Sequence, residues 1–93
     1  MADLDAAVIR SVILDLIEER GAGKTICPSE AARAASPEDW RGLMKTVRRE
    51  AVAMALDGQA SIMRKGKPVD PLDFKGVYRI GLPTGEVGDG EGA

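Results

Sequence analysis

The chain has 93 residues, a formal net charge of −2, no histidine and a single cysteine. This length allows one small domain and excludes two separate cores or a doubly wound enzyme fold. Without histidine the chain lacks the commonest general base and zinc ligand, and one thiol forms neither an internal disulfide nor a zinc site. We therefore expect a non-enzymatic protein without cofactor or metal. We expect it in the cytoplasm, because a lone cysteine suits a reducing compartment and no membrane-spanning run or signal peptide is visible.

The first third of the chain has the spacing of helices. Apolar residues recur every three or four positions over residues 4–20, which predicts an amphipathic helix. A turn and a short extended piece are expected over 21–27. Pro28 is typical of a first helical position, because its missing N–H would be unpaired there, and it predicts a second helix over 28–35.

A longer third helix is predicted over 37–57. Ser36 and Pro37 form a start signal, and Gly58 is a typical end. At 100° per residue its apolar positions fall within about 120° and should pack on the core. These positions are Trp40, Leu43, Met44, Val47, Ala51, Met54 and Ala55.

After the third helix the pattern changes to that of strands. Residues 59–64 and 76–82 have strand character, and we expect them to pair. Pro68 and Pro71 cannot donate to a ladder, so residues 65–75 are expected to form one long hairpin loop.

The predicted elements make one folded unit and a tail. Residues 83–93 are Gly-rich and acidic and are expected to be disordered, which leaves residues 1–82 as the domain. The order of helix, short strand, two helices, strand, loop and strand predicts an α+β winged helix-turn-helix domain. We expect three to four helices and a small antiparallel sheet that includes the wing.

Three motifs in this order carry a family resemblance. They are Lys24-Thr25-Ile26-Cys27-Pro28-Ser29-Glu30 with Ala31 and Arg33; Trp40-Arg41, Leu43-Met44 and Val47-Arg48-Arg49; and Gly58, Lys65-Gly66-Lys67-Pro68-Val69-Asp70-Pro71 and Gly76. Over residues 6–82 the chain resembles a small bacterial family, domain of unknown function 3253. The resemblance implies a winged-helix-like fold. That family has no established activity, so the resemblance implies no functional residue.

Positive charge is concentrated in the middle of the chain. Residues 40–67 hold seven basic and two acidic residues, whereas residues 1–23 and 81–93 each carry a net charge of −3. In a helix-turn-helix protein the second helix of the pair enters the major groove, where Arg and Lys contact phosphates and guanine. We therefore expect double-stranded DNA as a partner. The expected contacts are Arg41, Lys45, Arg48, Arg49, Arg64, Lys65 and Lys67.

Three alternatives stay open. A winged helix can also act as a protein-interaction adaptor without DNA binding, and the acidic first helix and tail would suit a basic partner. The basic residues can be ordinary surface residues, either solvated or paired with Glu30, Glu38 or Glu50. A redox or nucleophilic role for Cys27 is the weakest alternative, because a free cysteine more often packs as a small buried residue.

Two further patterns have structural interpretations. Gly21-Ala22-Gly23-Lys24-Thr25 resembles part of a phosphate-binding loop, but Glu18 stands where that motif needs its first glycine, so we interpret it as a helix end and a turn. Asp70 and Asp73 flank Pro71, where aspartate commonly stabilises a turn.

Overall fold

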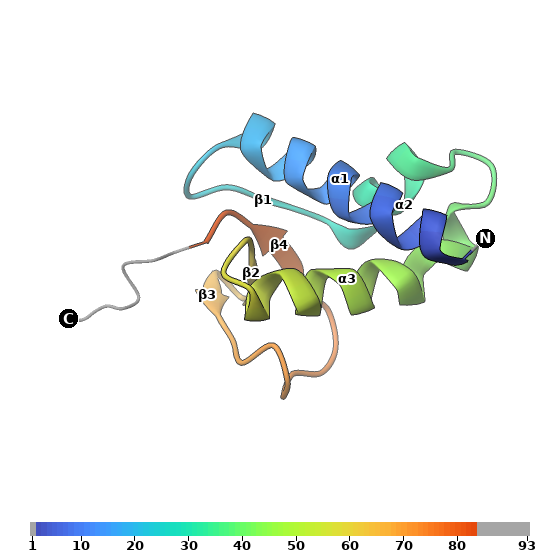
Figure 1. Cartoon of the computed structure of the whole chain (residues 1–93). Coiled ribbons are helices and arrows are strands. Elements are labelled where there is room, and N and C mark those ends of the chain that lie inside the picture. The colour runs from blue at the N-terminus through green and yellow to red at the C-terminus, as the bar shows by residue number, and fades with distance from the viewer. Residues whose placement is uncertain (1, 84–93) are drawn as a thin grey trace.

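The computed structural model describes the backbone of residues 2–83 and the side chains of residues 6–83 (Figure 1). The elements in chain order are α1 (Ala2–Arg20), β1 (Thr25–Ile26), α2 (Pro28–Ala35), the 3₁₀ helix η1 (Trp40–Leu43), α3 (Met44–Leu56), β2 (Ser61–Arg64), β3 (Lys67–Pro68) and β4 (Arg79–Gly81). Apart from Pro83, the predicted tail over 83–93 lies outside the described residues.

The four strands form one antiparallel sheet in the order β1-β4-β2-β3. Ile80 of the central strand β4 lies opposite Ile26 of β1 and Ile62 of β2, and all three side chains are buried. The last strand is thus inserted between the first two, and α2 and α3 form the connection between β1 and β2. This arrangement confirms the predicted α+β winged helix-turn-helix fold.

The helices pack their predicted apolar faces together. Ile9, Ile13 and Ile17 of α1 follow i, i+4 spacing and are completely buried. Val47, Ala51 and Met54 of α3 are buried equally deeply. Figure 1 shows α1 above α3, with the strands near the C-terminal end of α3. The core therefore lies between the helices and the sheet, and leaves the other side of α3 available.

The start of the third helix differs from the prediction. Ser36 Oγ accepts the N–H of Asp39 at 3.2 Å, as an N-cap would, but residues 37–39 form a turn. The chain then makes the 3₁₀ helix η1, and α3 begins only at Met44. Gly42 has a low propensity for α-helix, which favours the tighter winding at this point. As a result, Arg41 lies in η1 and outside the α-helix that carries Lys45 and Arg49.

The connection between β2 and β4 also differs from the prediction. Instead of one long loop, the chain turns tightly at Lys65–Gly66, where both residues have positive φ, and β3 pairs with β2. Pro68 lies opposite Met63, and it is tolerated because β3 is an edge strand. Loop 69–78 follows, with a positive φ of +83° at Gly76. The strand predicted over 76–82 is reduced to the three residues of β4, Arg79–Gly81.

Candidate nucleic-acid interface and the adjacent groove

The exposed face of α3 presents two of the predicted basic residues. Lys45 and Arg49 are one helical turn apart and both are exposed. Lys45 makes no ion pair or hydrogen bond with the described part of the chain. Arg49 lies 3.5 Å from Glu50, but its side chain is 65% exposed, and Arg10 of α1 holds the same carboxylate at 3.2 Å. Both cations therefore face solvent.

A stacked group of two arginines and one tryptophan precedes α3. The guanidinium groups of Arg33 and Arg41 lie 4.5 and 4.6 Å from the centroid of the Trp40 ring. Trp40 is partly buried and packs against the core, as predicted, and its ring holds both cations in place. Neither arginine forms an ion pair with a described acidic residue. Arg33 did not appear among the predicted contacts, because its proximity to Trp40 depends on the unpredicted 3₁₀ helix.

Arg48 is directed to the protein itself. Its guanidinium carbon lies 4.1 Å from the centroid of the Phe74 ring and 5.6 Å from that of Tyr78. It also donates a hydrogen bond of 3.2 Å to the carbonyl oxygen of Phe74. The two rings contact each other edge to face at 5.2 Å. Arg48 thus attaches loop 69–78 to α3, and it is a positioning residue for this loop.

Arg64 has the same kind of role on the other side of the loop. Its Nε donates a hydrogen bond of 2.8 Å to the carbonyl oxygen of Val77. A Cβ atom at Gly76 would come within 3.2 Å of the same guanidinium, so glycine allows this close approach as well as the positive φ. Lys65 and Lys67, at the turn of the β2–β3 hairpin, are exposed. Six of the seven predicted contacts are exposed, and Arg64 is partly buried. Arg48 is exposed but bonded to the Phe74 carbonyl, which leaves five cations that do not hold loop 69–78: Arg41, Lys45, Arg49, Lys65 and Lys67.

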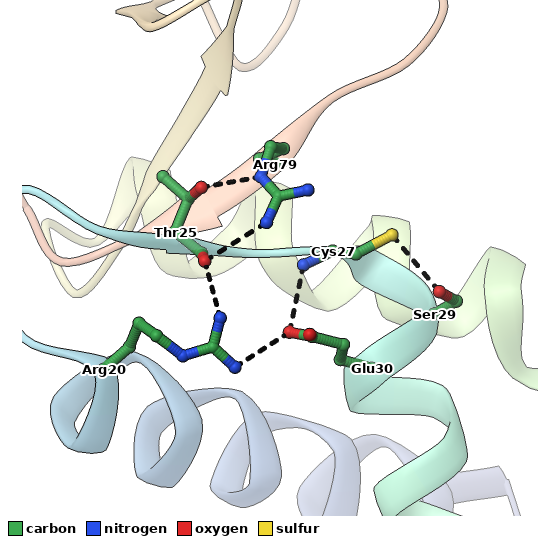
Figure 2. Close-up of polar contacts among 6 residues, drawn as sticks. All are labelled: Arg20, Thr25, Cys27, Ser29, Glu30 and Arg79. Atoms are coloured by element: carbon green, nitrogen blue, oxygen red, sulfur yellow. Dashed lines mark hydrogen bonds and ion pairs between the residues drawn. The ribbon is translucent and has the colours of Figure 1, made fainter.

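A polar cluster joins four elements around β1 (Figure 2). The carbonyl oxygen of Thr25 accepts hydrogen bonds from Arg20 at 3.0 Å and from Arg79 at 3.3 Å. Arg79 also donates to the Thr25 hydroxyl at 2.7 Å. Arg20 pairs with Glu30 at 3.1 Å, and the same carboxylate oxygen accepts the N–H of Cys27 at the start of α2. The cluster fixes the end of α1, β1, α2 and β4 relative to one another.

The β1–β4 pairing opens onto a groove. Because Ile26 lies opposite Ile80, the chain directions bring Cys27 towards the residues that precede Ile80. The groove has a volume of about 440 Å³. Its lining is mostly apolar and consists of Cys27, Pro28, Ser29, Met44, Gly76, Val77 and Tyr78.

Two ionisable residues line this groove. Cys27 is only partly buried, so the expectation of a small buried cysteine is wrong. Its Sγ lies 3.2 Å from the Ser29 hydroxyl (Figure 2), and this contact, aided by the charge of Arg79, lowers the pKa of the thiol. Tyr78 is 8% exposed, and burial raises the pKa of its hydroxyl to about 12.

The sequence matches a known protein family over most of its length. Residues 6–83 match the family described as protein of unknown function, DUF3253. The chain belongs to the DUF3253 family. No curated protein matches the sequence.

The three motifs of the DUF3253 resemblance lie at junctions of the fold. The first forms the polar cluster around Thr25, and the second contains the stacked Trp40 and the loop anchor Arg48. The third includes Gly58, which ends α3 with a φ of +80°, and the tight turn of the hairpin. These contacts give structural reasons for the motifs and do not by themselves assign an activity.

Metal-binding and membrane-spanning features were also sought among the described residues. Across residues 6–83 no three cysteine, aspartate or glutamate side chains gather in a way that could hold a metal ion. Within the described helices, none is long and apolar enough to span a membrane. The Asp70–Asp73 pair forms a turn, in which the Asp70 carboxylate accepts the N–H of Leu72 at 2.9 Å.

Proposed function

We propose that this member of the DUF3253 family is a non-enzymatic module that binds double-stranded DNA through α3 and the β2–β3 hairpin. The observation that carries the proposal is the position of its solvent-facing cations. Four of them lie on α3 and the hairpin, the helix and wing with which winged-helix proteins approach a duplex, and the fifth, Arg41, lies in η1 directly before α3. The four are Lys45, Arg49, Lys65 and Lys67.

The contacts divide into two kinds. Lys45 and Arg49 project from α3, where they can enter the major groove and contact phosphates or guanine. Lys65 and Lys67 are at the tip of the hairpin, where they can reach the neighbouring backbone. Arg48 and Arg64 support these contacts indirectly, because they hold the loop that follows the hairpin.

The stacked arginines extend this surface. Arg33 belongs to α2, the first helix of the motif, which crosses the phosphate backbone in helix-turn-helix proteins. Arg41 stacks on the same Trp40 ring as Arg33. Stacking reduces the freedom that each guanidinium would lose on binding a phosphate. We therefore add Arg33 to the proposed contacts.

The test is a duplex titration by fluorescence anisotropy with the full chain at about 50 and 200 mM salt. Each phosphate contact contributes about 0.9 to the slope of log affinity against log salt concentration, so Lys45→Gln/Arg49→Gln should lower the slope by up to about 2. Lys24→Gln is the matched control, because Lys24 is exposed beside β1, at the sheet edge opposite the hairpin. Affinity that is independent of salt, or that falls equally in both variants, would contradict the proposal.

A protein-interaction adaptor is the second candidate, and a different observation favours it. Leu72 and Val77 of loop 69–78 are 73% and 84% exposed, more than any other large apolar residue among residues 6–83. Exposed apolar surface marks protein-interaction sites when it is contiguous. An adaptor would use this loop to bind a partner. Leu72→Ser/Val77→Ser should then abolish co-purification of a defined partner and leave duplex affinity unchanged.

A further inference from the structure

The groove beside Cys27 has the walls of a small-molecule site. Pro28, Met44 and Val77 supply apolar surface to its lining. Its volume of about 440 Å³ is within the range of pockets that bind small molecules. A ligand bound in this groove would contact mainly hydrocarbon, so the ligand needs at least one apolar portion.

The Tyr78 hydroxyl supplies a polar group without a protein partner. The side chain is more than nine-tenths buried and lines the groove, yet its hydroxyl forms no hydrogen bond with any residue the structure describes. Phe74 and Arg48 hold the ring, so the hydroxyl is fixed in position. Burial raises the pKa of Tyr78 to about 12, and the hydroxyl is therefore protonated at neutral pH and is available as a donor. It is complementary to a carbonyl oxygen.

The Cys27 thiol supplies a nucleophile at the same place. Its Sγ is near the Ser29 hydroxyl at the first turn of α2, and Arg79 lies nearby. These groups stabilise the thiolate, which is the reactive form. Cys27 and Tyr78 line the same groove. Burial raises the pKa of Tyr78, the charge of Arg48 opposes this, and a negative charge on Cys27 adds to it.

We propose that this groove binds a small apolar molecule with an α,β-unsaturated carbonyl group, and that the Cys27 sulfur adds to its β carbon while the Tyr78 hydroxyl binds the carbonyl oxygen. The sulfur–carbon bond forms as the carbon–carbon π bond breaks, and the electron pair moves onto the oxygen as an enolate. Tyr78 stabilises this oxygen by its hydrogen bond. Water then protonates the α carbon, and the proton lost from the thiol balances it, so the addition needs no oxidant or reductant.

The adduct would also contact the proposed DNA-binding helix. Met44 is the first residue of α3, and Tyr78 is stacked beneath Arg48 of the same helix. An effect of the adduct on duplex affinity is a consequence that rests on the proposed function. Formation of the adduct itself does not depend on DNA binding.

The test uses 4-phenylbut-3-en-2-one, an apolar enone, with the full chain, and follows adduct formation by intact mass. Iodoacetamide is the reference reagent, because it alkylates thiols without needing the groove. We expect the ratio of the enone rate to the iodoacetamide rate to exceed that of free N-acetylcysteine by about tenfold or more. Cys27→Ser should give no adduct.

Tyr78→Phe isolates the hydroxyl, because it keeps the ring and its stacking. Loss of one hydrogen bond to the developing charge should slow the enone reaction by about threefold to tenfold and leave the iodoacetamide rate unchanged. A rate ratio equal to that of the free thiol, or equal effects of Tyr78→Phe on both reagents, would overturn the proposal.

A measurement on the unaltered protein completes the test. The saturated ketone 4-phenylbutan-2-one cannot react with a thiol, but it should occupy the groove and protect Cys27 from iodoacetamide. Absence of protection up to the solubility limit of the ketone would also overturn the proposal. Duplex affinity of the adduct, measured separately, tests the consequence for α3 without affecting these outcomes.

Discussion

Replacement of Arg48 by alanine should destabilise the fold although the side chain is on the surface. The arginine makes a charged hydrogen bond to the Phe74 carbonyl at 3.2 Å and stacks on the Phe74 ring at 4.1 Å. A hydrogen bond from a charged donor at a partly exposed position contributes about 1 to 1.5 kcal/mol, and an exposed cation–π contact about 0.5 to 1 kcal/mol. We therefore expect Arg48→Ala to lower the free energy of unfolding by about 2 kcal/mol.

Substitutions at Arg48 and at its neighbour Arg49 separate the contacts with Phe74 from the effect of charge. Arg48→Lys keeps the charge but loses the planar stack and the forked donor, so it should cost about 1 kcal/mol. Arg49→Ala removes a side chain that is 65% exposed and should stay within about 0.5 kcal/mol of the original protein.

Thermal and urea unfolding followed by circular dichroism measure all three variants. A loss of 2 kcal/mol should lower Tm by roughly 8 to 16 °C in a domain of this size. If Arg48→Ala proves as stable as Arg49→Ala, the attachment of loop 69–78 by Arg48 is refuted.

Three other predictions test the remaining contacts. Burial raises the pKa of Tyr78 to about 12, whereas the unfolded value is about 10, so the unfolded state loses this proton first and the free energy of unfolding should fall by roughly 2 kcal/mol between about pH 10 and 12. Tyr78→Phe should remove that part of the fall, measured by urea unfolding at each pH, and an unchanged dependence on pH would contradict the role of Tyr78. Glu50→Ala should cost about 1 to 2 kcal/mol in urea unfolding, because the buried carboxylate holds Arg10 at 3.2 Å, and Glu50→Gln should cost less; equal losses would show that the charge itself matters. Gly81→Ala should lower Tm, since its Cβ atom would come within 3.0 Å of the Lys24 carbonyl oxygen. Gly42→Ala should leave Tm unchanged, because its Cβ atom would meet nothing within 4 Å, and equal effects of the two substitutions would argue against the close approach at Gly81.

The elements that follow a regular pattern could be predicted from the sequence. The spacing of Ile9, Ile13 and Ile17 reports directly which face of α1 is buried, and Pro28 marks the start of α2. The start of α3 could not be located in the same way. The Ser36 cap forms as expected, but it closes a turn and does not start the α-helix. Which of these two outcomes occurs depends on how the following residues pack.

Strand β3 illustrates a second limit. The absent N–H of Pro68 excludes a central strand but is compatible with an edge, and the sequence does not state which position a strand will take. Only the completed order β1-β4-β2-β3 makes β3 an edge. The prediction of a single long loop failed because it applied the rule for central strands.

The candidate nucleic-acid interface could be predicted from the distribution of charge in the sequence, but the contacts of each basic side chain could not. Sequence spacing located the basic residues on the third helix and the wing, yet it gave no way to distinguish Arg48 from Arg49. Arg48 finds its partner 26 positions away in Phe74, whereas Arg49 lies beside the already neutralised Glu50. Such distinctions arise from tertiary packing, as does the approach of Cys27 to Tyr78.

Tyr78 links the groove to α3. Its ring lies under the Arg48 guanidinium on the side of α3, and its side chain lines the groove beside Cys27. Loop 69–78 passes below α3 (Figure 1), and Arg48 and Arg64 hold it at Phe74 and Val77, on either side of the turn at Gly76. A group that displaced Tyr78 from the groove would therefore have to loosen a contact of α3 as well. This mechanical link follows from the packing alone, and it would exist whether the partner of α3 is a duplex or another protein.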